Sequence, residues 1–205
     1  MLTRIRNDVR TALENDPAAD HWATVLLTYA GLHAVWGHAI AHRLWTSGHH
    51  LTARVFSHVV RSVTGVEIHP AATVGERVFI DHGMGTVVGE TAEIGDDVQL
   101  FHGVTLGGKS DDPVKRHPTL EDGVTVGASA TLIGDITIGE DATVGAGAVV
   151  VDDVEPGTTV VGVPAEQIDG DEEVSTESVS EDLLAEYGTD PADADGGTDG
   201  CCEAD

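Results

Sequence analysis

The chain has 205 residues, of which 40% are hydrophobic and only 4% are aromatic. That is enough apolar material for the core of one or two domains. Acidic residues outnumber basic ones by 36 to 10, and the resulting net charge of −26 excludes partners that require a basic surface, such as nucleic acids and anionic membranes. Because salt would screen this self-repulsion, we expect a halophilic protein in a high-salt cytoplasm. The alternative is an ordinary acidic protein whose acidic C-terminal segment inflates the count.

The sequence also favours a cytoplasmic location. No run of about 20 apolar residues is present, and the N-terminus does not have the pattern of a signal peptide. The only cysteines, Cys201 and Cys202, are adjacent and cannot build a disulfide framework, which fits a reducing compartment. The pair is either a site for redox chemistry or metal binding or, as we favour, two solvated cysteines without a role.

Residues 1–65 are predicted to form a helical N-terminal domain. Apolar residues recur at helical spacing in four segments, which begin near residues 2, 22, 32 and 51. Residues 15–17, Gly31 and residues 47–48 separate these segments, and Gly65 ends the last one. We expect the domain to pack as a cap on the first coil of the structure that follows.

Beyond the helices, branched aliphatic residues recur at every sixth position. The ladder consists of Ile68, Val74, Ile80, Val88, Ile94, Leu100, Leu106, Leu120, Val126, Leu132, Ile138, Val144 and Val150. A six-residue period matches neither a helix nor a plain strand, but it suits short strands joined by tight corners, three to a coil. We therefore predict roughly four coils of a parallel β-helix over residues 66–165, and an acidic tail, 166–205, whose composition is typical of disorder. A β-rich sandwich with fortuitous spacing is the alternative.

The ladder is interrupted twice, and ionisable residues lie beside both interruptions. Thr86-Val87 is a two-residue insertion that follows Asp81 and His82. Residues 107–119 form a loop rich in Gly, Asp, Lys and Pro. A regular scaffold that extrudes one loop usually does so for function.

These residues suggest acid–base chemistry and the binding of an anion. Glu67 comes 15 residues before His82, close to one coil of 18, so it can lie one layer away. A carboxylate against an imidazole sets its tautomer and raises its basicity, which describes a general base for a hydroxyl group. Arg116 and His117 close the extruded loop, and a guanidinium there is suited to clamp a carboxylate.

Several short stretches carry a more specific signal. They are residues 16–18, 31–34, 81–85, 88–95, 103–108, 116–118 and 161–165. Together they closely resemble the serine O-acetyltransferases, a branch of the hexapeptide-repeat acyltransferases, over roughly residues 10–166. The repeat alone would indicate only the superfamily, whereas His82, the pair at 107–108 and the triplet at 116–118 are specific to this branch. The resemblance implies a left-handed parallel β-helix with an α-helical N-terminal part.

The resemblance also implies an activity. The enzyme would transfer acetyl from acetyl-CoA to the hydroxyl of L-serine, without a metal, and so supply O-acetyl-L-serine for cysteine biosynthesis. His82 would be the general base, with Glu67 as the residue that orients it. The serine-binding residues would be Asp16, Asp81, Arg116 and His117. The residues at the acetyl-CoA site would be Gly107, Gly108, Lys109, Gly127 and Ala128, and backbone N–H groups near the first two would face the thioester oxygen. A homotrimer with its sites between subunits is expected.

The sequence departs from the family's pattern in four places. Glu67 stands where well-known members have Asp, and its longer side chain is expected to reach His82. The loop at residues 107–113 differs from the usual Gly-Gly-Thr-Gly-Lys. The N-terminal region is shorter than in the long forms, whose extra helices pair two trimers, so both a trimer and a dimer of trimers stay open. The C-terminal residues lack the Ile-ending peptide that docks into cysteine synthase, so that partnership does not carry over.

Three other functions compete with this one. The first is acetylation of another small hydroxyl or amine acceptor, such as a sugar, but Asp16, Asp81 and Arg116 favour a small zwitterion. The second is a carbonic-anhydrase-like zinc enzyme, which would need three converging histidines. The histidines available for such a site are His69, His82, His102 and His117. The third is a non-catalytic scaffold, which would not need an acid–base pair.

Overall fold

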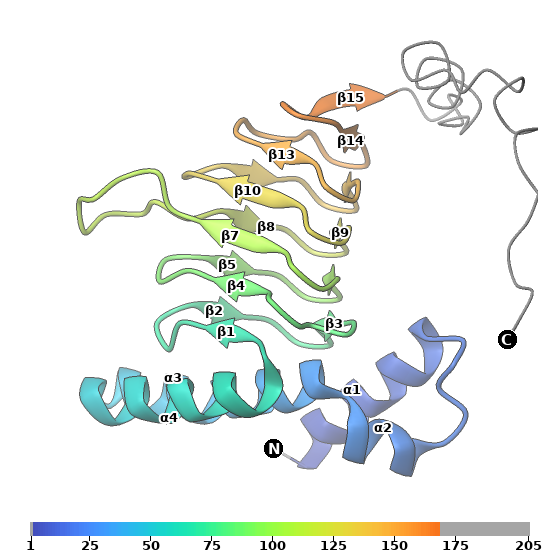
Figure 1. The fold of residues 1–205 in the computed structure, drawn as a ribbon, viewed down its shortest axis with the longest axis vertical. Coiled ribbons are helices and arrows are strands. Elements are labelled where there is room, and N and C mark those ends of the chain that lie inside the picture. Colours follow the sequence, from blue (N-terminus) through green and yellow to red (C-terminus); the bar gives the residue numbers. More distant parts are fainter. Residues whose placement is uncertain (1, 169–205) are drawn as a thin grey trace, which may run out of the picture. The chain divides into compact units, whose positions relative to one another are not determined.

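The computed structural model describes residues 2–168 (Figure 1). Four helices come first: α1 (Leu2–Asn15), α2 (Trp22–Thr28), α3 (Ala30–Thr46) and α4 (His50–Thr64). All four helical segments predicted from the sequence are therefore present. Helix α4 ends as predicted at Gly65, whose left-handed conformation (φ 75°) is typical of a glycine at a helix C-terminus.

Gly31 does not separate two helices, contrary to the prediction. The break lies at Tyr29, which has an extended conformation (φ −84°, ψ 96°), and Gly31 lies inside α3. A Cβ atom at Gly31 would lie 1.9 Å from the carbonyl oxygen of Ile80. Glycine is needed here because α3 approaches the backbone of the first coil too closely for any side chain.

Short strands form three sheets after the helices. Sheet A consists of β1 (Glu67–Ile68), β4 (Val87–Val88), β7 (Thr105–Gly107), β10 (Thr131–Ile133) and β13 (Val149–Val150). Sheet B consists of β2 (Thr73–Val74), β5 (Glu93–Ile94), β8 (Thr119–Leu120) and β11 (Thr137–Ile138). Sheet C consists of β3 (Phe79–Ile80), β6 (Gln99–Leu100), β9 (Thr125–Val126), β12 (Thr143–Val144), β14 (Thr159–Val161) and β15 (Glu166–Ile168). The chain visits the sheets in the order A, B, C, so each circuit is one coil of a β-helix.

Strands of successive coils pair in parallel, and their register aligns the predicted aliphatic ladder. In sheet A, Ile68 pairs with Val88, Val88 with Leu106, Leu106 with Leu132, and Leu132 with Val150. The first and third steps are longer than one coil of 18 residues because they contain the two predicted interruptions. Each interruption therefore leaves the inward-facing residues in register and only changes a corner.

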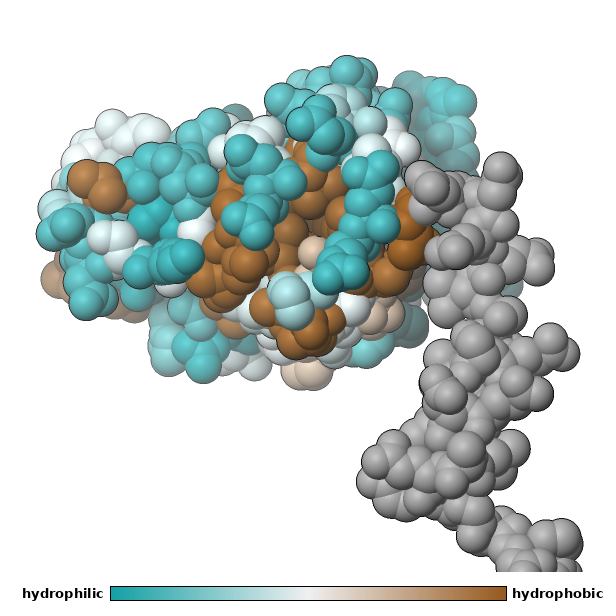
Figure 2. All heavy atoms as spheres, turned by 90° about the horizontal axis from the view of Figure 1, so that it is seen from above, coloured by the Kyte–Doolittle hydropathy of each residue, from teal (hydrophilic) through white to brown (hydrophobic). Residues whose placement is uncertain are grey.

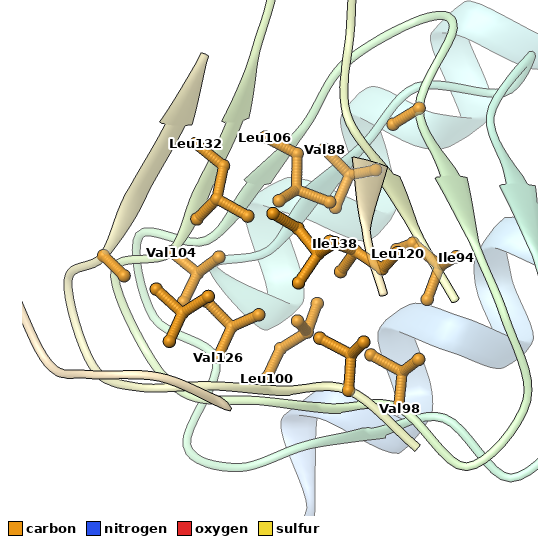
Figure 3. Close-up of a cluster of buried hydrophobic side chains, with 14 of the residues drawn as sticks. Val88, Ile94, Val98, Leu100, Val104, Leu106, Leu120, Val126, Leu132 and Ile138 are labelled. Atoms are coloured by element: carbon orange, nitrogen blue, oxygen red, sulfur yellow. The ribbon is translucent and has the colours of Figure 1, made fainter. Parts of the chain in front are cut away.

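The aliphatic side chains fill the interior of the prism. Figure 3 shows ladder residues of all three sheets pointing toward one another, among them Val88, Ile94 and Leu100. Leu100, Leu106, Leu132 and Ile138 are completely buried. Burial of a side chain of this size contributes about 1.5–3 kcal/mol, so the repeat holds the corners rigidly.

The helices cover the first coil. Helices α3 and α4 contact β1, and α1 and α3 contact β3. Two histidines of α3 bind the backbone of the first coil: His38 Nε2 lies 3.1 Å from Ala72 O, and His42 Nδ1 lies 2.8 Å from Pro70 O. These histidines belong to the packing of the cap.

At the other end, β15 pairs antiparallel with β14 and so covers the last coil's edge. Figure 2 looks onto this end, where hydrophobic side chains lie between hydrophilic rims. None of the helices within residues 2–168 combines the length and the hydropathy needed to span a membrane. The Cys201-Cys202 pair lies outside the described residues.

Candidate active site

The first polar corner lies where the chain passes from sheet C to sheet A, and we call it corner 1. It comprises residues 81–86, between β3 and β4. His82 and Gly83 both have positive φ angles (58° and 75°), a backbone conformation that residues other than glycine rarely adopt. The His82 side chain is 76% exposed, and its Nε2 lies 3.8 Å from Asp81 Oδ2. An exposed imidazole beside a carboxylate can accept a proton from a bound hydroxyl group.

Corner 1 forms one wall of a cleft of about 250 Å³, and the helices form the other. The residues that line it are Asp16, Thr28, Tyr29, Ala30, Gly31, Ile80, Asp81 and His82. Asp16 comes from the turn after α1, and Tyr29 from the break between α2 and α3. Three of the predicted site residues are therefore together here: Asp16, Asp81 and His82.

Asp16 is held as a charged carboxylate. Its Oδ2 accepts a hydrogen bond of 2.5 Å from the Tyr29 hydroxyl, and its Oδ1 accepts one of 2.8 Å from the Ala18 N–H. These hydrogen bonds, that of Tyr29 first, lower the pKa of Asp16. Burial and the nearby carboxylates raise the pKa of Tyr29 to about 12, so its hydroxyl keeps its proton.

The second polar corner, corner 2, lies where the chain passes from sheet A to sheet B. It contains Glu90 and Thr91, between β4 and β5, and the extruded loop between β7 and β8, which projects from the prism in Figure 1. Arg116 in this loop forms an ion pair with Glu90 (Nη2 to Oε2, 2.7 Å) and also donates to Asp112 O (3.0 Å). The guanidinium is thus held in place and still 22% exposed.

His117 is buried at corner 2 and bound to Thr91. Its Nδ1 accepts a hydrogen bond from the Thr91 N–H (3.2 Å), so the neutral ring carries its proton on Nε2. Burial, and then the charge of Arg116, lower the pKa of His117. At neutral pH this imidazole is an uncharged N–H donor rather than a cation.

The predicted site residues thus fall into two groups on opposite edges of sheet A. Asp16, Asp81 and His82 lie at corner 1, and Arg116 and His117 lie at corner 2. One side of the prism is about six residues long, which separates the corners by roughly 15–20 Å. That is too far for one amino acid to touch both corners of the same chain.

The predicted contact between Glu67 and His82 is not formed within the described chain. Glu67 begins β1, one coil below Val87, and its carboxylate forms an ion pair of 3.0 Å with Arg61 of α4. The sequence separation of 15 residues places the two in adjacent layers, but Glu67 lies on sheet A and His82 on the corner beside it. No hydrogen bond or ion pair joins them among residues 2–168.

The residues predicted to contact acetyl-CoA are also divided between the two edges of sheet A. Gly107 ends β7, and Gly108 and Lys109 begin the loop at corner 2, where the Lys109 N–H donates to Arg116 O (3.3 Å). Gly127 and Ala128 follow β9 and lie on the same edge of sheet A as corner 1, two coils further along the prism. A Cβ atom at Gly127 would lie 2.6 Å from the Ala146 nitrogen, so glycine there permits close stacking of the coils.

Sequence reasoning missed three residues of these corners: Tyr29, Glu90 and Thr91. Glu90 and Thr91 lie in a stretch that matched the family pattern, which was a usable signal. Tyr29 lies in the predicted helical domain, and nothing in the sequence connects it to Asp16. Within residues 2–168, no group of three or more His, Cys, Asp or Glu side chains is placed to hold a metal ion.

Comparison with known proteins gives consistent matches. The family model described as bacterial transferase hexapeptide (six repeats) matches residues 117–152. The chain is 55% identical to the serine acetyltransferase of Mycobacterium tuberculosis over 168 residues, which are 82% of this chain and 73% of that protein.

Solved structures give the same result. The serine acetyltransferase of Neisseria gonorrhoeae in complex with serine is 43% identical, with a TM-score of 0.79 over 82% of this chain and 69% of that one. The enzyme of Brucella abortus in complex with coenzyme A is 38% identical, with a TM-score of 0.79 over 82% of this chain and 67% of that one. The predicted fold class, a left-handed parallel β-helix of hexapeptide repeats with helices before it, is confirmed by these similarities.

Proposed function

The chain belongs to the serine acetyltransferase family, and on that premise we propose that it transfers the acetyl group of acetyl-CoA to the hydroxyl of L-serine. The products are O-acetyl-L-serine and CoA, and the reaction is the first step of cysteine biosynthesis from serine. The observation that carries the proposal is the chemistry of the two corners. Carboxylates and an exposed imidazole meet at corner 1, and a fixed guanidinium and an N–H donor meet at corner 2. Together they suit an acceptor with an ammonium, a carboxylate and a hydroxyl group.

In the proposed reaction His82 is the general base. Its imidazole takes the proton from the serine hydroxyl as the oxygen attacks the thioester carbonyl carbon. The tetrahedral intermediate then expels CoA as a thiolate, which takes the proton from the imidazolium. Backbone N–H groups near Gly107 and Gly108 would stabilise the oxyanion. Asp81 Oδ2 lies 3.8 Å from His82 Nε2, so a carboxylate stands beside the positive charge that the ring carries between the two steps.

The ends of the substrate are assigned by charge. Asp16 and Asp81 would hold the serine ammonium, since both line the cleft beside His82. Arg116 and His117 would hold the carboxylate, the first through its charge and the second through Nε2–H. A sugar acceptor would leave these charges without partners, so L-serine is the acceptor that uses all four residues.

We propose a homotrimer in which corner 1 of one copy meets corner 2 of the next. The support is the roughly 15–20 Å that separate the two corners within one chain. Sheet A lies between these corners, and its outward side chains are largely uncharged. They include Val87, Thr105, Thr131, Ile133 and Val149. The corner between sheets B and C, by contrast, stacks acidic residues in successive coils, so like-charge repulsion opposes association through it.

In the proposed trimer, the remaining assigned residues would lie at or beside the interface between two copies. Acetyl-CoA would lie along the groove between two copies, with Gly107, Gly108 and Lys109 of one and Gly127 and Ala128 of the other. Glu67 faces outward from sheet A, beside corner 1, and its assigned role is to orient His82 at that corner of the same chain. It would have to leave Arg61, an exposed ion pair of the kind that contributes little to stability.

We retain three broader proposals from the sequence: a cytoplasmic location, adaptation to high salt, and a division into helical (1–65), β-helical (66–165) and acidic (166–205) parts. The net charge of −26 supports the second. The melting temperature should rise steeply with KCl concentration. A melting temperature that is the same without salt would contradict halophily and leave the activity proposal untouched.

The activity is tested by CoA release from acetyl-CoA with L-serine at high KCl. We expect His82→Ala to lower kcat by at least about 100-fold, the low end for a general base. His102→Ala is the matched control, because His102 lies one coil further along the same edge of the prism, with its ring 6.1 Å from that of His82. Full turnover in a folded His82→Ala variant would refute the assigned role. Stoichiometric zinc required for turnover would favour the carbonic-anhydrase-like alternative.

A further inference from the structure

Asp16 reaches the cleft from an exposed turn, yet its carboxylate is fixed. The turn follows the last residue of α1, and the Asp16 N–H donates to Ala12 O (3.0 Å). The only side-chain group that holds this carboxylate among the described residues is the Tyr29 hydroxyl. We infer that Tyr29 is a positioning residue, which aims Asp16 at the amino group of the acceptor. This inference rests on the proposed function.

The Tyr29 ring is itself held rigidly. Its backbone N–H donates to Val25 O (3.2 Å), and its carbonyl accepts from the His33 N–H (3.2 Å). The ring stacks on Phe79, with centroids 6.4 Å apart and planes inclined by 29°. Phe79 is almost completely buried, and Tyr29 packs against the cluster that Phe79 forms with Ala12, Val25 and Leu32. The hydroxyl is therefore presented from a fixed support.

The chemistry of the hydrogen bond suits this role. The hydroxyl lies close enough to Asp16, Asp81 and Asp20 for their charges to act on it, so it remains protonated and can only donate to a carboxylate. Each carboxylate oxygen can accept two hydrogen bonds. Asp16 Oδ2 uses one site for Tyr29 and keeps one for an ammonium N–H. Without the hydroxyl, the Ala18 N–H alone would hold the carboxylate, through Oδ1, and Oδ2 would lose its fixed direction toward the cleft.

A positioning role and a merely structural role predict different kinetics. If Tyr29 acts through Asp16, its loss affects only the binding of serine. If it serves only to pack α2 and α3 on Phe79, its loss disturbs the whole cleft, acetyl-CoA included. Tyr29→Phe separates the two, because it removes the hydroxyl and keeps the stacked ring.

The test compares the wild type, Tyr29→Phe, Asp16→Asn and the double variant in the CoA-release assay. We expect Tyr29→Phe to raise the serine KM about 10-fold, the effect of one hydrogen bond to a charged group, with the acetyl-CoA KM changed less than about twofold. The double variant should be no worse than Asp16→Asn alone, since the two residues act as one unit.

Three results would overturn the inference. The first is an unchanged serine KM in Tyr29→Phe. The second is an equal rise in both KM values. The third is a double variant whose loss is the product of the two single losses, which would mean that Tyr29 and Asp16 act independently. If the wild type itself released no CoA with serine, the proposed function would fail first, and this inference with it.

Discussion

The Thr91 hydroxyl and the His117 ring form one closed hydrogen-bonding unit. Thr91 Oγ1 lies 2.9 Å from His117 Nδ1 and also accepts the backbone N–H groups of Arg116 (3.0 Å) and His117 (3.2 Å). Since Nδ1 has no proton, the hydroxyl donates to it. Thr91 therefore fixes the tautomer of His117 through its backbone N–H, and its hydroxyl fixes the path of the loop backbone at Arg116.

Replacement of Thr91 by Val should impair serine binding. The variant keeps the shape of the side chain but leaves the backbone N–H groups of Arg116 and His117 without a partner, at a cost of about 1–3 kcal/mol for a buried group. His117 Nδ1 then keeps only the hydrogen bond from the backbone N–H of residue 91. We expect the serine KM to rise about 10-fold while the acetyl-CoA KM changes little. Thr91→Ser, which keeps the hydroxyl, is the control and should stay close to the wild type. Equal KM values in the two variants would contradict this role.

Gly89 should tolerate no side chain as long as His117 is present. A Cβ atom there would lie 1.9 Å from His117 Cδ2 and 2.1 Å from Nε2, so Gly89→Ala must displace the ring. We expect Gly89→Ala to lose serine affinity about as strongly as His117→Ala. The combined variant should be no worse than His117→Ala, because the displaced ring is already absent. A further loss in the combined variant would mean that Gly89 acts through the backbone instead.

Stability should depend on the titration of His38. Burial lowers the pKa of His38 from 6.5 to about 4. The folded state therefore binds fewer protons than the unfolded state, so stability is complete above about pH 6.5 and falls as the pH drops toward 4, by up to about 1.4 kcal/mol per unit. Urea unfolding at fixed KCl measures this. His38→Gln, which keeps an N–H donor for Ala72 O, should give a flatter curve. Parallel curves would show that other groups cause the dependence.

The regular part of the fold could be read from the sequence because the six-residue period carries it. Each ladder residue faces the interior, so spacing alone determines the register, as the pairing of Leu106 with Leu132 across the extruded loop illustrates. The two interruptions could also be located from the sequence, because a break in the six-residue period marks a changed corner. The prediction for Gly31 was wrong because the sequence does not distinguish a glycine that ends a helix from one that permits close packing. The distinction depends on the neighbouring backbone, here that of Ile80.

The site was less predictable than the fold. Asp81 and His82 could be found because they are adjacent and beside an insertion. The pairing of Glu67 with His82 was inferred from separation along the chain, which gives the layer but not the side of the prism. The hydrogen bond from Tyr29 to Asp16 joins two different helical segments and depends on how they fold together. The distribution of the site over two corners follows only from the order of the sheets.

The central claim is that a complete serine site takes corner 1 from one copy and corner 2 from another. It is tested most directly by co-expressing His82→Ala and Arg116→Ala chains, each inactive alone, and measuring CoA release from the purified mixed trimers. In a random mixture about one site in four combines two wild-type corners, so we predict recovery of about a quarter of wild-type activity. Activity no higher than the mean of the two separate variants would contradict the account, because it would place the whole site within one chain.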